Sequence, residues 1–327
     1  MTSLDTTVAA PASGLRDLLR RAWQTNRPLT LVGIAMIPIF VIALAGIIFD
    51  PRIITGQPAW LKPAKFAISI AIYSFTFIWM LGFVRGPRAE RLARWAATIT
   101  ALAFVVEMVV IVGQVIRGTT SHFNTATPLD GALFSLMGVF IVILWAAGIV
   151  LAGLLLVQRI PNRPLAWGLR LGMILTLIGA GLGFLMTMPT PTQQANLAAG
   201  VVVTAVGAHS VAVPDGGPGL PVFGWSTTGG DLRVAHFIGL HAMQVVPLSA
   251  WLLSLLALSE RRRTALVAVI GGGYGVLIAL TAWQALRGQP LIAPDALTLA
   301  ALGGLVVAVG LGVAGIVLSK TASRAAA

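Results

Sequence analysis

Long apolar runs separated by short polar stretches dominate the chain from residue 29 to residue 318. A helix needs about 20 apolar residues to cross a bilayer core of roughly 30 Å. Runs of that length predict eight membrane spans, near residues 29–49, 64–84, 95–116, 130–156, 166–187, 234–257, 265–286 and 297–318. The pattern therefore predicts an all-α fold, a polytopic transmembrane helical bundle.

Two segments flank the predicted bundle of residues 29–318, and one long external loop lies within it. Residues 1–28 contain the stretch SGLRDLLRRAWQ, which predicts a short amphipathic helix on the cytoplasmic membrane surface. This segment has no early apolar core and no small-residue cleavage site, so it does not predict a secretory signal. Residues 189–233 are expected to form an external lid, although the apolar stretch NLAAGVVVTAVGAHSVAV leaves re-entry into the membrane open. Residues 319–327 are expected to be a cytoplasmic tail.

Composition supports a membrane protein, because 57% of the residues are hydrophobic, 10% are charged and the mean hydropathy is +0.92. The net charge of +12 comes from short basic clusters between apolar runs, so it indicates membrane orientation and not a nucleic-acid partner. Sixteen Lys and Arg residues fall on the side of the two termini and six on the other side, which predicts that both termini are cytoplasmic. The chain has no cysteine, which excludes disulfides and thiolate ligands.

Pairs of small residues within the spans predict close packing between helix backbones. These are Gly179 with Gly183, Gly271 with Gly275, and Gly303 and Gly304 near Gly310.

Polar residues converge at one depth on the external side. With a rise of 1.5 Å per residue, Glu107 lies roughly 13 Å below the external end of its span, and His241 lies roughly 10 Å deeper than His236. Glu107 is the carboxylate expected inside a span, and an ionisable group in the membrane indicates a functional site. We therefore expect Glu107 and His241 to be the catalytic or proton-exchanging pair.

Helical geometry places the polar side chains around His241 on two different faces of the helix. At 100° per residue His241 and Gln244 share a face, whereas His236 points toward a neighbouring helix or the lid. Pro247 removes a backbone donor, so the helix is expected to bend beside Gln244.

Further polar residues at the external ends of the spans are candidate ligand-binding groups. These are Lys62, Lys65, Tyr73, Gln114, Arg117, His122, Asn124, Arg233, His236 and Gln244. Asp130 and Asp231 are better explained as residues at helix N-termini, where the helix dipole stabilises an acid.

Three functions fit this pocket. The first is redox chemistry on a bound haem, metal or quinone, in which His241 could serve as an axial haem ligand. His241, Glu107, His122 and His236 could alternatively hold a divalent metal, although their spacing matches no known zinc motif. The second is proton-coupled transport or sensing of a small anionic or amphiphilic solute. The third is a scaffold whose polar residues only hold helices together.

Two resemblances accompany these residues. The string VAHF is similar to the haem-ligand helix of haem–copper oxidases, but Ile238 stands where that pattern has its second histidine. The stretches WLKPAKFAIS, SHFNTATPLDG and PDGGPGLPVFGWSTTGGDLRVAHFIGLHAMQ resemble those of multi-pass membrane proteins of high-G+C actinobacteria, a family with no settled activity. That resemblance implies a location in the bacterial cytoplasmic membrane.

Overall fold

A computed structural model of the chain describes residues 14–319. Its helices are α1 (Leu15–Thr25), α2 (Arg27–Phe49), α3 (Leu61–Leu81), α4 (Pro87–Ile116), α5 (Pro128–Val157), α6 (Arg163–Met186), α7 (Pro191–Ala198), α8 (Leu232–Leu240), α9 (Ala242–Ser254), α10 (Glu260–Leu286) and α11 (Ala296–Leu318). Two antiparallel strand pairs complete it, β1 (Ile53–Ile54) with β2 (Gln57–Pro58), and β3 (Ser210–Val211) with β4 (Gly230–Asp231). The prediction of an all-α fold is confirmed.

Each predicted span coincides with a long helix, apart from the sixth. Seven helices are long and apolar enough to cross a membrane, and the bent pair α8 and α9 makes an eighth if it is counted as one span. Several helices begin before the predicted runs; α4, for example, begins at Pro87 and not near residue 95. Hydropathy detects the apolar part of a helix, whereas the polar first turns of α4 are helical as well.

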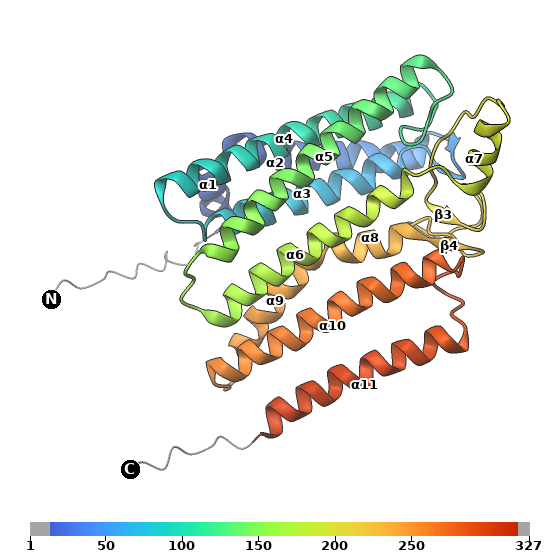
Figure 1. Cartoon of the computed structure of the whole chain (residues 1–327). Coiled ribbons are helices and arrows are strands. Elements are labelled where there is room, and N and C mark those ends of the chain that lie inside the picture. The colour runs from blue at the N-terminus through green and yellow to red at the C-terminus, as the bar shows by residue number, and fades with distance from the viewer. Residues whose placement is uncertain (1–13, 320–327) are drawn as a thin grey trace, which may run out of the picture.

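The long helices lie side by side, and α1 and the C-terminal end of α11 are at the same end of the bundle (Figure 1). We call this end the terminal face and the opposite end the cap face. The cap consists of residues 187–231 with the connections 50–60, 117–127 and 287–295. Residues 189–233, the expected lid, contain α7 and the strand pair of β3 with β4, and residues 199–213 contain no helix.

The helices pack as two groups. Helix α3 packs on α2 and α4, and α4 packs on α5, while α6 packs on α8, α9 and α10. The contact of α5 with α6 joins the groups. In the described part of the chain, contacts of α3 with α8 and α9 are sparse.

The sixth span is broken at His241, where α8 and α9 meet at an angle of 45°. A break leaves backbone groups without partners inside the helix ladder. Oγ1 of Thr176 accepts a 2.9 Å hydrogen bond from the Met243 N–H, and the Tyr274 hydroxyl donates a 2.6 Å bond to the Ile238 carbonyl. The expected bend therefore exists but lies one turn before Gln244, where α6 and α10 supply these partners.

Close glycine packing also shapes the broken span. Gly179 of α6 meets Gly239 of α8, and a Cβ atom on Gly179 would lie 2.4 Å from the Cα of Gly239. Gly271 similarly faces Leu171. The prediction fails for α11, because Cβ atoms on Gly303, Gly304 and Gly310 would meet nothing within 4 Å. Helix α11 packs mainly on α10, and these glycines do not face it.

The N-terminal amphipathic helix is observed as α1, with Ala22 buried and Leu15 and Leu18 exposed. Residues 1–13 of that predicted segment and residues 320–327 of the predicted tail lie outside the described residues.

Candidate functional site

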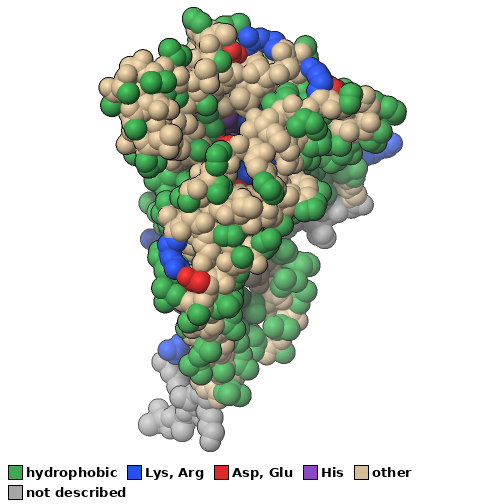
Figure 2. Space-filling view, turned by 90° about the vertical axis from the view of Figure 1, so that its right-hand side faces the viewer, with side chains coloured by type: hydrophobic (Ala, Val, Ile, Leu, Met, Phe, Trp, Pro, Cys, Tyr) green, Lys and Arg blue, Asp and Glu red, His purple; other side chains and the backbone are tan. Residues whose placement is uncertain are grey.

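The cap face is hollowed near its centre, and histidine, acidic and basic atoms are visible inside the hollow (Figure 2). Electrostatic interactions link five side chains at the cap end of the bundle: Lys62 interacts with Glu107 and with His122, and His122 interacts with His209 and His236. We call Lys62, Glu107, His122, His209 and His236 the cap chamber. Helices α3, α4 and α8 and two cap loops contribute these residues.

Glu107 is the most unusual group in the chamber. Its residue is 1% exposed, and neither carboxylate oxygen has a hydrogen-bond partner among residues 14–319. Buried polar atoms are nearly always hydrogen-bonded, because an unpaired one costs about 1–3 kcal/mol. Lys62 supplies the strongest electrostatic attraction to Glu107, yet no ion pair within 4.0 Å forms between them.

Lys62 has its ammonium group 6.0 Å from the ring centre of Phe66. It makes no hydrogen bond with the described residues. The next lysine on α3, Lys65, differs because its Nζ donates a 3.0 Å hydrogen bond to the carbonyl of Phe223 in the cap. The chamber therefore holds one unpaired cation and one unpaired carboxyl group.

One ring nitrogen of His236 forms a hydrogen bond with the backbone of α6. Its Nδ1 lies 2.8 Å from the carbonyl oxygen of Gly179, so Nδ1 carries the proton and donates it. In the neutral ring Nε2 is then a hydrogen-bond acceptor.

The two loop histidines are held by neighbours in the cap. Nδ1 of His122 lies 3.1 Å from Ser121 Oγ, and Nδ1 of His209 lies 2.7 Å from Asp215 Oδ2. Burial lowers the pKa of His122 well below 6.5, and the charges of Lys62, His209 and His236 lower it further. Burial also lowers the pKa of His209, which the hydrogen bond to Asp215 opposes. Both rings are neutral at pH 7.

His241 occupies the break between α8 and α9. Its ring packs against Phe237, with 4.4 Å between the ring centres, and its side chain interacts with that of Gln244. Gln244 in turn donates a 3.2 Å hydrogen bond from Nε2 to Oγ1 of Thr76 in α3. His241 and Gln244 therefore share a face, as the helical spacing predicts. The unpaired oxygens of Glu107 show that no hydrogen bond joins it to His241 in this structure.

Thr76 and Gln244 also line a groove of about 590 Å³. Its walls are mostly apolar and include Trp79 of α3, Phe83 just after α3, and Trp251 of α9. Its lining runs from Thr76 and Gln244 to Ser254 and Asn162 near the terminal face.

Several predicted ligand-binding residues hold the cap in place. Gln114 and Arg117 both donate to Asp130 Oδ1, at 2.8 and 2.7 Å. Asn124 donates to Thr119 and to the Thr120 carbonyl, at 3.0 and 3.1 Å.

The remaining two candidates are also partnered. Nε of Arg233 donates a 2.9 Å bond to Asp231 Oδ1, and its Nη2 donates a 2.6 Å bond to the Gly224 carbonyl. Tyr73 stacks on Phe77 and meets the edge of Phe104. The helix-terminal roles of the acids are confirmed, because Asp231 is the N-cap of α8 and Asp130 lies in the first turn of α5 after its N-cap Thr127.

The four residues considered as metal ligands do not come together as such. Residues 14–319 contain no group of three or more His, Asp or Glu side chains able to hold a metal ion. The reason is visible for His236, whose Nδ1 is bonded to Gly179, and for His241, which lies at the helix break beside Phe237.

Sequence reasoning missed Asp215, Thr76 and Thr176. Asp215 accepts hydrogen bonds from the backbone N–H groups of His209 and Ser210, at 3.0 and 2.8 Å. Its place in the turn PDGG indicates a loop but not a partner six residues away. The two threonines lie in apolar helices, where no sequence signal distinguishes them.

No protein-family model, no curated protein and no solved structure matches this chain. Inference about function therefore depends on the cap chamber, and the resemblance to actinobacterial membrane proteins stays an expectation.

Proposed function

We propose that this protein is a membrane-embedded carrier or receptor that binds a small anion together with a proton in the cap chamber. The observation that carries the proposal is the buried Glu107 carboxyl group, with both oxygens unpartnered, close to the unpaired ammonium of Lys62. A purely structural carboxylate is expected to have hydrogen bonds that offset its burial.

The chemistry of these two groups favours an anion and a proton bound together. The Lys62 ammonium attracts an anion, whereas an ionised Glu107 repels one. Protonated Glu107 removes this repulsion and supplies a hydrogen-bond donor, so binding of the anion promotes binding of the proton. The neutral histidines around Lys62 offer further donors and acceptors for the solute.

The broken sixth span supports transport over permanent binding. Discontinuous helices are typical of carriers, in which non-helical backbone at membrane depth lines a binding site. His241 lies at such a break, and the nearby Gln244 lines the groove along α3 and α9. We further propose that the cap face is extracytoplasmic, that both termini are cytoplasmic, and that the host membrane is the bacterial cytoplasmic membrane.

Binding of a panel of small carboxylates to purified protein, with the accompanying proton uptake, tests the proposal. Wild-type protein is expected to take up a proton with each anion bound. Glu107→Gln is expected to bind without proton uptake, and Lys62→Met is expected to lose binding. Lys65→Met is the matched control, because its ammonium is already bonded to Phe223. Unchanged proton uptake in Glu107→Gln would contradict the proposal.

Solute flux separates the alternatives that the sequence leaves open. In proteoliposomes a carrier moves the anion down an imposed pH gradient, and Glu107→Ala or His241→Ala abolishes this flux with expression retained. A reduced-minus-oxidised absorption band in purified protein would favour the redox function instead. Loss of folding in Glu107→Gln would favour the scaffold.

A further inference from the structure

A second polar pocket lies at the terminal face, where α5 turns into α6. It has a volume of about 450 Å³. Its walls comprise Leu156, Val157, Gln158, Arg159, Ile160, Pro161, Arg163, Ala166, Trp167 and Arg170. Three of these residues are arginines, although the pocket belongs to a membrane-spanning part of the chain.

The guanidinium group of Arg170 is fixed by the end of α5. Nε donates a 3.1 Å hydrogen bond to the Leu155 carbonyl, and Nη2 donates a 2.8 Å bond to the Gln158 carbonyl. Its Cζ also lies 5.8 Å from the ring centre of Trp167. These contacts give Nε and Nη2 hydrogen-bond partners and fix the orientation of the guanidinium group. Nη1 has no hydrogen bond to residues 14–319.

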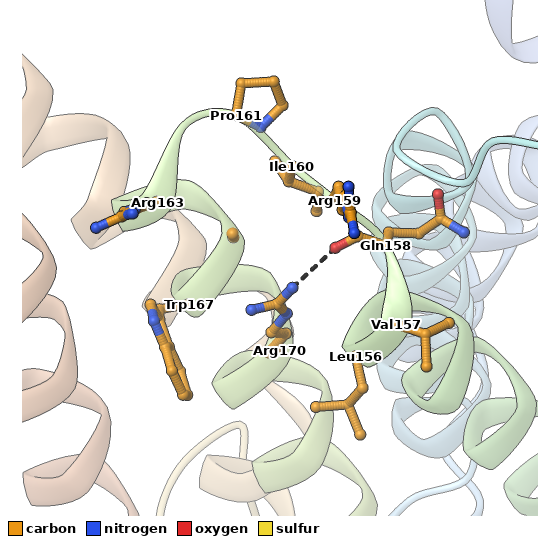
Figure 3. Close-up of a pocket in the computed structure, with 10 residues that line it drawn as sticks. Leu156, Val157, Gln158, Arg159, Ile160, Pro161, Arg163, Trp167 and Arg170 are labelled. Atoms are coloured by element: carbon orange, nitrogen blue, oxygen red, sulfur yellow. Dashed lines mark hydrogen bonds between the residues drawn. The ribbon is translucent and has the colours of Figure 1, made fainter.

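Arg159 lies on the same side of the turn as Arg170, whereas the Arg163 side chain points the other way (Figure 3). The Arg159 side chain is exposed and makes no hydrogen bond or ion pair with the described residues. Nearby, Glu260 uses its Oε1 to accept a 3.1 Å bond from the Arg163 backbone N–H. The pocket therefore presents two arginines on one side of the turn, Arg159 and Arg170, while the Glu260 carboxylate is bound to the Arg163 backbone.

Apolar surface continues from this pair toward the membrane. Leu156 is 49% exposed, Val157 is 75% exposed and Trp167 is 44% exposed. Tryptophan favours the membrane interface, and a basic pocket between spans is suited to an anionic lipid headgroup. A phosphate group accepts hydrogen bonds from guanidinium groups in fixed geometry, while an acyl chain can cover the exposed aliphatic side chains.

We infer that the α5–α6 pocket binds the phosphate of an anionic phospholipid through Arg159 and Arg170, with the acyl chains along Leu156 and Val157. This inference is independent of the anion and proton proposed for the cap chamber.

Native mass spectrometry of the full chain in detergent, titrated with phosphatidylglycerol, tests the inference. Arg159→Gln is the principal variant, because the Arg159 side chain has no partner in the fold to lose. It is expected to weaken phosphatidylglycerol binding about tenfold, as loss of a charge-assisted hydrogen bond requires. Arg163→Gln removes the same charge from the same turn and is expected to bind like wild type.

Two further arms identify the source of the phosphate. Phosphatidylcholine and inorganic phosphate are each expected to bind at least about tenfold more weakly than phosphatidylglycerol. Equal affinity of Arg159→Gln and Arg163→Gln would overturn the assignment to Arg159. Inorganic phosphate that competes at the same concentration as the lipid would overturn the assignment to a lipid. Arg170→Lys, checked by its melting temperature, tests the second arginine separately.

Discussion

Thr176 of α6 accepts a 2.9 Å hydrogen bond from the backbone N–H of Met243, one residue into the second half of the broken span. The threonine hydroxyl thus replaces a carbonyl of the helix ladder at the position where the ladder stops. Both residues are buried, so water cannot replace this hydrogen bond. The contact therefore helps to determine where the span breaks.

Removal of that hydroxyl should destabilise the fold. Thr176→Val keeps the side-chain shape but leaves the Met243 N–H unpaired in an apolar region, which is expected to cost about 1–3 kcal/mol. Thr176→Ser keeps the acceptor and is the control. Thermal unfolding in detergent measures both variants, and equal melting temperatures for Val and Ser would show that the hydroxyl is not needed.

The contact of Gly179 with Gly239 should tolerate no side chain. Gly179→Ala places a methyl group 2.4 Å from a backbone atom, so α6 and α8 must separate. We expect a destabilisation of about 2 kcal/mol or more, in the range found for overpacked cores. Gly303→Ala in α11 is the matched control, because its methyl group would meet nothing within 4 Å. A similar change in melting temperature for the two variants would contradict this expectation.

Acidification should loosen the cap. The folded cap keeps His209 neutral, since its pKa lies below 6.5, whereas an opened cap allows the ring to bind a proton. Cap stability is therefore complete above the unfolded pKa of about 6.5 and declines as the pH falls through the folded pKa.

Asp215 contributes over a lower pH range. Burial opposes its ionisation, but hydrogen bonds from His209 and Ser210 hold its pKa below the ordinary 3.8. The contribution of Asp215 to cap stability is present above about pH 4 and is lost only below that pH. Hydrogen-exchange protection factors of residues 207–216, each corrected for the intrinsic exchange rate at that pH, should be lower at pH 5.0 than at pH 7.5, and His209→Asn should reduce the difference. Identical protection at both pH values would refute the expectation.

Glu107→Gln should maintain or increase the stability of the fold. The carboxylate oxygens have no hydrogen bonds to lose, so replacing the charge by an amide removes part of the burial cost, about 1 kcal/mol. The melting temperature in detergent measures this effect. A decrease of several degrees would instead show that the carboxylate holds α3 and α4 together through Lys62.

Hydropathy predicted the helices well because membrane burial acts on every residue of a span in the same way. Each of the eight apolar runs has a helix at its place, and the failure at the sixth concerns one residue. His241 stands at the break because Thr176 and Tyr274 from other helices satisfy the freed backbone groups. Such long-range partners leave no trace in the local sequence, which instead points to Pro247.

The sequence predicted which polar residues lie near the site, but not which residues contact one another. Depth placed Glu107 and the histidines near the same end of the bundle, and the structure links Glu107 to Lys62 on the neighbouring α3. The sequence predicts Arg117 and Gln114 as candidate ligand-binding groups, but both donate hydrogen bonds to Asp130, a residue expected at a helix terminus. The rotation of each helix about its axis determines which polar side chains face one another. Hydropathy does not determine that rotation.

The Gly179–Gly239 contact restricts how the chamber can change shape. Two backbones that touch without intervening side chains cannot slide or tilt past one another without losing their fit, so α6 and the first half of the sixth span form a rigid wall. Any widening must come from the opposite wall at α3, where single hydrogen bonds from Lys65 and to Thr76 make the connection. Under the proposed function, solute access to Glu107 is therefore expected from the α3 side, which also carries Lys62.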